Sequence, residues 1–132
     1  MTEPDSTSTL IERFLASFNG GDLAAMRDVL ADDAVAYITG PDGEPMVLNG
    51  ASAYTAALEA IHLGDVDYSV TLTQAPVMVG DDQVLIMVEV RARREAKTLH
   101  NFAAHLLRVA DGRIVEMFMV DAKPAESDAF WA

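Results

Sequence analysis

Two side chains near the end of this 132-residue sequence, His105 and Asp121, have types and positions suited to acid–base chemistry. His105 lies between Ala103 and Leu107 on one face of an alternating, strand-like segment. An imidazole titrates near neutral pH, so His105 could be a general acid or base, or a neutral group that orients a ligand. The alternative is a core histidine whose ring nitrogens bond to a buried carbonyl or water.

We expect Asp121 to lie too far from His105 for a direct pair. A type I turn over residues 110–112 would place Asp121 opposite Asn101 in the last hairpin. The same register places Met117 opposite His105. Four residues at about 3.3 Å each then separate His105 from the level of Asp121, roughly 13 Å. The alternative for Asp121 is a carboxylate at a strand end that caps the tail or meets solvent.

The apolar residues on one face of this hairpin indicate that this face forms the wall of an apolar cavity. Together with the first helix, the first strand and the long central strand, it supplies the candidate ligand-binding residues Phe14, Phe18, Ile38, Val88, Val90, Asn101, Met117 and Met119. Methionine side chains adapt to irregular ligands. The alternative for each of these residues is ordinary packing in the core.

The opposite face of the hairpin is apolar too, since it carries Phe102, Leu106, Phe118 and Val120. A sheet covered by helices on one side should be polar on the other. We therefore expect a homodimer through this outer face. The alternative is a twisted sheet that covers its own residues.

The elements that must position these residues follow from hydrophobic spacing. The stripe of Leu10, Phe14 and Phe18 predicts an amphipathic helix, and similar spacing predicts two more helices. Period-two alternation predicts an antiparallel meander after Gly64. The expected helices cover residues 8–18, 22–31 and 49–61, and the expected strands cover residues 34–39, 46–48, 68–73, 84–93, 99–109 and 113–121. The pattern predicts a single α+β domain over residues 1–132, with one helical turn in the tail that Phe130 and Trp131 anchor.

Composition excludes several classes of function. Nine basic residues against 21 acidic ones give a net charge of −12, which would repel nucleic acid and an anionic membrane surface. The chain has no cysteine, and its three histidines lack metal-ligand spacing, so we expect no metal and no cofactor. It also lacks a signal peptide and an apolar stretch of about 18 residues, so we expect a cytoplasmic protein.

Three ordered segments resemble the nuclear transport factor 2-like superfamily. They are residues 19–22 (Asn-Gly-Gly-Asp), 30–35 (Leu-Ala-Asp-Asp-Ala-Val) and 109–116 (Val-Ala-Asp-Gly-Arg-Ile-Val-Glu). The sequence is most similar to SnoaL-like polyketide cyclases and ketosteroid isomerases. The resemblance implies a cone, in which three N-terminal helices pack on a strongly curved antiparallel sheet that encloses a pocket. It also implies a homodimer through the convex face of the sheet.

The catalytic positions that the resemblance implies are mostly occupied by other residues in this sequence. Where ketosteroid isomerases carry a tyrosine, an aspartate base and a protonated aspartate, this chain has Phe14, Ile38 and His105. Phenylalanine cannot donate to an oxyanion and isoleucine cannot remove a proton, so that mechanism does not apply. SnoaL-like cyclases place an acid–base aspartate where this chain has Met119, and Asp121 follows two residues later.

Two functions are therefore consistent with the sequence. The first is a cofactor-free isomerase, cyclase or lyase that acts on a small hydrophobic substrate, with His105 as acid–base group or oxyanion donor. The second is a non-catalytic module that binds an apolar ligand or only dimerises.

Overall fold

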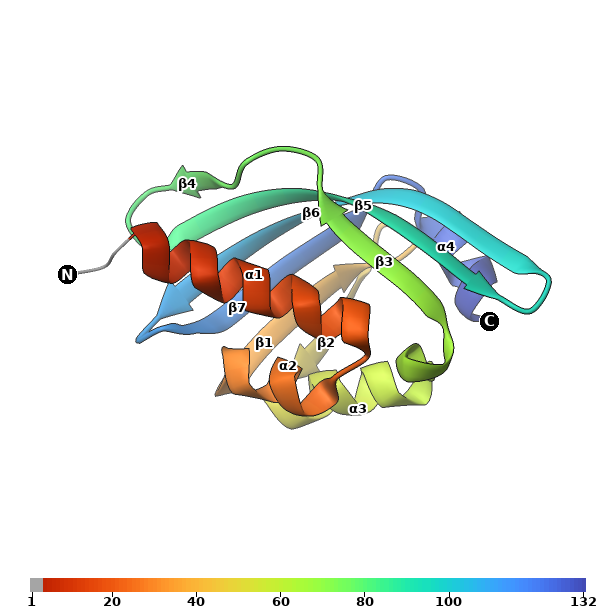
Figure 1. Ribbon diagram of the computed structural model, residues 1–132, viewed down its shortest axis with the longest axis horizontal. Coiled ribbons are helices and arrows are strands. Elements are labelled where there is room, and N and C mark those ends of the chain that lie inside the picture. The colour runs from red at the N-terminus through yellow and green to blue at the C-terminus, as the bar shows by residue number, and fades with distance from the viewer. Residues whose placement is uncertain (1–3) are drawn as a thin grey trace.

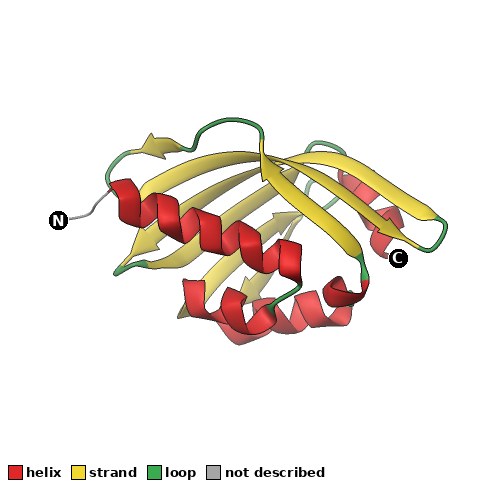
Figure 2. Ribbon diagram, in the orientation of Figure 1, coloured by secondary structure: helices red, strands yellow, loops and turns green. Residues whose placement is uncertain are grey.

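Figure 1 shows the computed structural model, which describes residues 4–132. In chain order the elements are α1 (Pro4–Gly20), α2 (Leu23–Val29), β1 (Leu30–Thr39), β2 (Pro45–Asn49), α3 (Ala51–Ala60), the 3-10 helix η1 (Leu63–Asp65), β3 (Asp67–Leu72), β4 (Val77–Val79), β5 (Gln83–Arg94), β6 (Lys97–Ala110), β7 (Arg113–Asp121) and α4 (Pro124–Trp131). Helices α1, α2 and α3 lie on one side of the sheet (Figure 2), so the predicted α+β class is confirmed. None of the described helices is long and apolar enough to cross a membrane.

The first two helices form where the apolar stripe and the turn residues predict them. Phe14 and Phe18 of α1 are buried and contact each other edge to face, with ring centroids 5.1 Å apart. The chain reverses at Gly21, which has a positive φ of 60°. A Cβ at this position would lie 2.7 Å from the Cα of Gly64, so the close approach requires glycine. Asp22 then caps α2, since its carboxylate accepts the backbone N–H of Ala25 at 3.0 Å.

The sheet is mixed, so the prediction of a purely antiparallel sheet was wrong. Its strand order is β2-β1-β7-β6-β5-β3, with β4 also paired to β5, and β1 runs parallel to β7. These two strands are the first and the last in the chain, and no turn joins them, so local patterns do not reveal their pairing. The third helix follows β2, and only α1 and α2 precede the strands. Strong curvature and an enclosed cone remain predictions.

The turn of the last hairpin differs from the predicted one. Asp111 and Gly112, with φ of 54° and 75°, form a two-residue turn in which Ala110 pairs with Arg113. Positive φ at both central positions matches the right-handed twist of the adjoining strands. The predicted three-residue turn was therefore wrong.

A β-bulge then shifts the register by one further residue and leaves Val115 unpaired. As a result, His105 lies opposite Met119, and Asp121 lies opposite Ala103. In both pairs, the β7 residue that lies opposite the β6 residue is two positions later in the sequence than predicted. The two single-residue shifts add up to an even shift, so beyond the bulge each residue of β6 still pairs with a residue of β7 that was predicted on the same face. The predicted inner and outer faces of β6 are therefore correct.

The tail is longer and more ordered than one helical turn. Helix α4 has eight residues, and it lies at the far end of the sheet beside β6 (Figure 1). Phe130 is buried against the core and Trp131 is partly buried, which confirms both as anchors.

Candidate functional site

A pocket of about 440 Å³ lies between α3, α4 and the β1–β2 hairpin. It is lined mainly by apolar side chains, with a few polar groups among them. The lining residues are Ile38, Thr39, Gly40, Pro41, Met46, Leu48, Tyr54, Ala57, Leu58, Ile61, Asp121, Pro124, Ser127, Asp128 and Trp131. An apolar hollow with a few convergent polar groups has the composition of a small-molecule site.

Two phenols and one carboxylate share this region. Tyr54 of α3 is 3% exposed, and its hydroxyl donates to the sulfur of Met119 at 3.8 Å. Burial, and then the neighbouring Tyr68, raise the pKa of Tyr54. Burial, and then the negative charge of Asp121, raise the pKa of Tyr68. Both phenols therefore stay protonated and can donate hydrogen bonds at neutral pH.

His105 lies deeper and does not line the pocket. Its side chain is 8% exposed, and its ring contacts Phe14 edge to face at 6.1 Å. The Nδ1 atom is buried without a hydrogen-bond partner among the described residues. Burial lowers the pKa of His105 to about 4, so the ring is neutral at pH 7. It can donate one hydrogen bond and accept another, but it carries no proton to spare as an imidazolium.

The corrected register brings the two predicted catalytic residues closer than expected. Asp121 and His105 are diagonal neighbours on the inner face, since their cross-strand partners are Ala103 and Met119. Diagonal neighbours lie about 7–8 Å apart, within joint reach of one bound molecule. The expected separation of roughly 13 Å was therefore wrong, although no direct hydrogen bond joins the two side chains.

The predicted apolar wall residues divide into two groups. Ile38 lines the pocket, and Met119 contacts Tyr54 beside it. The other five are buried and do not line the pocket: Phe14, Phe18, Val88, Val90 and Met117. Their places fit the alternative of core packing.

Asn101 has a different role from a ligand contact, because every polar atom of its side chain is used within the chain. Its amide donates to the Lys123 carbonyl at 2.8 Å and to the Ser127 hydroxyl at 2.9 Å. Its carbonyl oxygen accepts the backbone N–H groups of Lys123 at 3.0 Å and Phe102 at 2.9 Å. Asn101 therefore fixes the start of α4, which forms one wall of the pocket.

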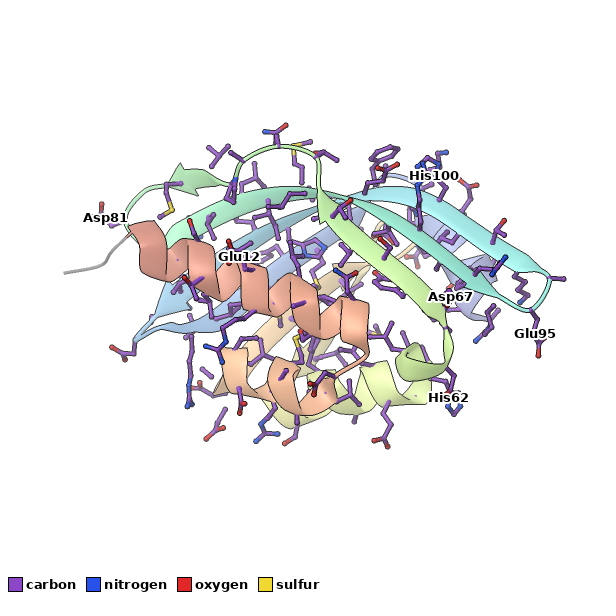
Figure 3. The ribbon with its side chains drawn as sticks, in the orientation of Figure 1. Glu12, His62, Asp67, Asp81, Glu95 and His100 are labelled. Carbon is purple, nitrogen blue, oxygen red and sulfur yellow. The ribbon has the colours of Figure 1, made fainter. Side chains whose placement is uncertain are left out.

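The sequence did not single out Tyr54, Asp128 or Trp131 as site residues. The signal that could have identified Tyr54 is its residue type, because a tyrosine at a buried helical position places a hydroxyl in the core. Trp131 was predicted as an anchor, and its place in the pocket wall depends on where α4 packs. His62 and His100 are exposed and point outward (Figure 3). Within residues 4–132, no three His, Cys, Asp or Glu side chains gather as metal ligands would.

Comparison with known proteins agrees with this architecture. A family model described as the SnoaL-like domain matches residues 11–117. The chain belongs to the SnoaL-like domain family. The predicted superfamily is thereby confirmed. This SnoaL-like chain is also 32% identical to an uncharacterized protein of Mycobacterium tuberculosis, over 97% of this chain and 98% of the relative.

Two solved structures, one of an epoxide hydrolase and one of the protein IdmH, share the fold. A LEH-like epoxide hydrolase of M. tuberculosis superposes with a TM-score of 0.77 at 17% identity, over 96% of this chain and 90% of that one. IdmH of Streptomyces antibioticus, provisionally described as a polyketide cyclase, superposes with a TM-score of 0.72 at 23% identity, over 92% and 97%. At these identities the likeness establishes the fold alone.

Proposed function

We propose that this SnoaL-like protein binds a small, mainly apolar molecule in the α3–α4 pocket and moves a proton on it without a cofactor. The observation that carries the proposal is that Asp121 and Tyr54 share one apolar wall. The Tyr54 hydroxyl contacts only a thioether sulfur, which is a weak acceptor. Asp121 makes no side-chain hydrogen bond or ion pair within the described residues. Both groups are therefore available to a ligand.

The chemistry that suits these groups is proton abstraction next to a carbonyl. Asp121 removes a proton from a carbon beside the carbonyl, and the electron pair moves onto the carbonyl oxygen. Tyr54 donates a hydrogen bond to that oxygen as it becomes an enolate. Asp121 then returns the proton to another carbon, which is an isomerisation. Alternatively, the enolate carbon attacks a second carbonyl of the same molecule and the new alkoxide takes the proton, which is a cyclisation.

In this proposal His105 is a third polar group, beyond the pocket lining, and an isomerase, cyclase or lyase would use it as a neutral group. Its unpartnered Nδ1 lies diagonally across from Asp121, so a hydroxyl or carbonyl that passes Met119 would satisfy it. The fold shared with the epoxide hydrolase and with IdmH supports small-molecule chemistry on such a scaffold.

The experiment follows binding and proton transfer separately. Decalone, an apolar ketone, is titrated while the fluorescence of Trp131, the single tryptophan, is recorded. Exchange of the protons beside its carbonyl for deuterium is then followed by NMR in D₂O. We expect Asp121→Asn to slow enzyme-dependent exchange by about a hundredfold or more and Tyr54→Phe by about a hundredfold, with binding retained.

The matched control is Asp33→Asn, which removes an exposed carboxylate from β1 and should leave binding and exchange unchanged. Binding without any exchange would contradict the enzymatic half of the proposal and favour the non-catalytic ligand-binding module. Failure of decalone and related apolar ketones to bind would contradict the proposed pocket itself.

We also propose that the outer face of the sheet pairs with a second copy of the chain. An apolar row crosses five strands on this face, formed by Leu85, Leu106, Phe118, Tyr37 and Val47 in successive partner positions. The rings of Tyr37 and Phe118 stack at 4.7 Å, which makes a flat centre for a self-complementary contact.

The exposure of neighbouring residues supports this assembly. Phe102 and Val120 are 42% and 47% exposed on the same face. Contiguous exposed apolar side chains of this kind are typical of a protein–protein contact. Light scattering should find a dimer at micromolar concentration and a monomer for Val120→Glu. Met78→Glu, at an equally exposed position on the edge strand β4, is the control and should stay dimeric. A monomeric unmodified chain would contradict the assembly.

A further inference from the structure

The charge of the pocket wall selects the kind of molecule that it can hold. Asp121 and Asp128 both line the pocket, the first partly buried and the second at the exposed rim. Neither takes part in an ion pair within the described residues. No lysine, arginine or histidine is among the lining residues. A carboxylate or phosphate on the ligand would therefore be repelled at short range, in a chain whose net charge is already −12.

The basic groups close to this wall are engaged elsewhere. Arg94 lies 5.9 Å from the centre of the Trp131 ring and donates to the carbonyl of Phe130 at 2.9 Å. The partial negative charge of the end of α4 offsets its charge. Lys123 pairs with Glu126 at 3.7 Å. Lys97 donates to the carbonyls of Ala129 and Ala132 at 3.3 Å and 3.2 Å. Two carboxylates thus line the pocket, whereas the cationic groups around α4 lie outside its lining and are held by helix carbonyls or by Glu126.

Aromatic rings complete the wall. Trp131 and Tyr54 both line the pocket, and Tyr68 lies behind Trp131 with a ring separation of 6.1 Å. The guanidinium of Arg94 already lies over the Trp131 ring, so the charge of a bound cation must be balanced by the carboxylates. The rings accommodate an apolar body. The carboxylates therefore favour a cationic group, and the rings favour an apolar body next to it.

We propose that the molecule bound in the α3–α4 pocket is an apolar body that carries a protonated amine. The amine lies at the rim, where Asp128 balances its charge and Asp121 adds a second attraction from deeper in the wall. The apolar body packs against the aliphatic lining of α3 and the β1–β2 hairpin. This inference rests on the proposed binding function of the pocket, but it is independent of whether catalysis occurs there.

The test compares three compounds with the same apolar cage and different charge. Adamantylmethylamine, adamantylmethanol and adamantanecarboxylate are titrated into the full chain, with Trp131 fluorescence and calorimetry as readouts. We expect the amine to bind about tenfold tighter than the alcohol, and the carboxylate to bind most weakly. The preference for the amine should shrink as salt is added, because the rim is exposed to solvent.

The decisive variant is Asp128→Asn, which removes an exposed carboxylate and should not affect folding. It should weaken binding of the amine by about fivefold and leave binding of the alcohol unchanged, whereas Asp33→Asn should change neither. Equal or tighter binding of the alcohol or carboxylate would overturn the inference while the pocket stands. Equal binding of the amine to Asp128→Asn and the unmodified chain would overturn it as well. If none of the three compounds binds, the inference falls together with the proposed function.

Discussion

Asn101 and His105 lie four residues apart on the same strand and the same inner face, yet their surroundings are opposite. Both are polar side chains in the core, 1% and 8% exposed. Asn101 uses both donors and both acceptor positions on α4 and the adjoining backbone. His105 has a buried Nδ1 with no partner among the described residues.

This difference separates a structural polar residue from a candidate functional one. A satisfied buried amide stabilises the fold and specifies where α4 packs. A buried nitrogen without a hydrogen-bond partner lowers the stability of the fold. This free energy is recovered only when a water or a ligand binds to it. Removal of the polar atoms should therefore lower the free energy of unfolding at Asn101 and raise it at His105.

The largest effect should come from Asn101→Ala. The change leaves the N–H of Lys123 and the hydroxyl of Ser127 without their partners, and it creates a cavity. The carbonyl of Lys123 loses one of its donors and keeps the backbone N–H groups of Glu126 and Ser127. We expect the free energy of unfolding to fall by about 4 kcal/mol in a denaturant titration. The fluorescence of Trp131 should also shift, because α4 loses its fixed start.

Asn19 provides the control for this change. Its side chain bonds to both backbone groups of Val70, at 3.1 Å and 2.7 Å, and so joins α1 to β3. Asn19→Ala should also lower stability, but the native fluorescence of Trp131 should not change. Equal shifts in both variants would contradict a specific role of Asn101 in placing α4.

The second effect concerns the pH dependence of stability. The pKa of His105 is lowered to about 4 in the folded chain, against an ordinary value of 6.5 when unfolded. Above pH 6.5 the ring is neutral in both states. Between pH 6.5 and 4 the unfolded chain binds the proton and the folded chain does not, so stability falls as the pH falls. This loss reaches about 3 kcal/mol at the acid end.

Denaturant titrations from pH 7.5 to 4 check this dependence. His105→Leu should remove this part of the slope and leave the part that the carboxylates cause. An identical pH profile for the two proteins would mean that the pKa of His105 is the same in the folded and unfolded chain, contrary to the effect of its burial.

The assignment of faces was predictable from sequence, but the partners across the strands were not. Alternation placed His105 and Met119 on the inner face and Phe118 on the outer face, and the burial of each agrees. Hydrophobic period two is a local property, and it survives any register shift by an even number of residues. The bulge after the turn is not visible in the sequence. On β7 it leaves Ile114, on the turn side of the unpaired Val115, fully buried.

The site was less predictable than the fold, because its wall depends on contacts between distant segments. Asp121 was identified from its type and strand position, and it does line the pocket. Trp131 reaches the same pocket only because Asn101, Arg94 and Lys97 hold α4 there. Such long-range side-chain contacts have no period and no spacing that a single sequence displays.

The third effect is a gain in stability. His105→Leu at pH 7 removes a buried nitrogen without a partner and keeps an apolar side chain against Phe14. We expect the free energy of unfolding to rise by about 1 kcal/mol. A clear loss of stability would show that a bound water satisfies the ring, which would place His105 with Asn101 among the structural residues.

The smallest effect tests the other end of α4. Arg94 donates to the carbonyl of Phe130 at 2.9 Å and stacks over its ring at 5.6 Å, but it is partly solvated. Arg94→Ala should therefore cost about 1 kcal/mol, well below Asn101→Ala. The neighbouring Arg93 is exposed and pairs with Asp67 at 3.4 Å, so Arg93→Ala should cost less still. An Arg94→Ala loss as large as that of Asn101→Ala would mean that α4 is held equally at both ends, and its start would no longer be the dominant contact.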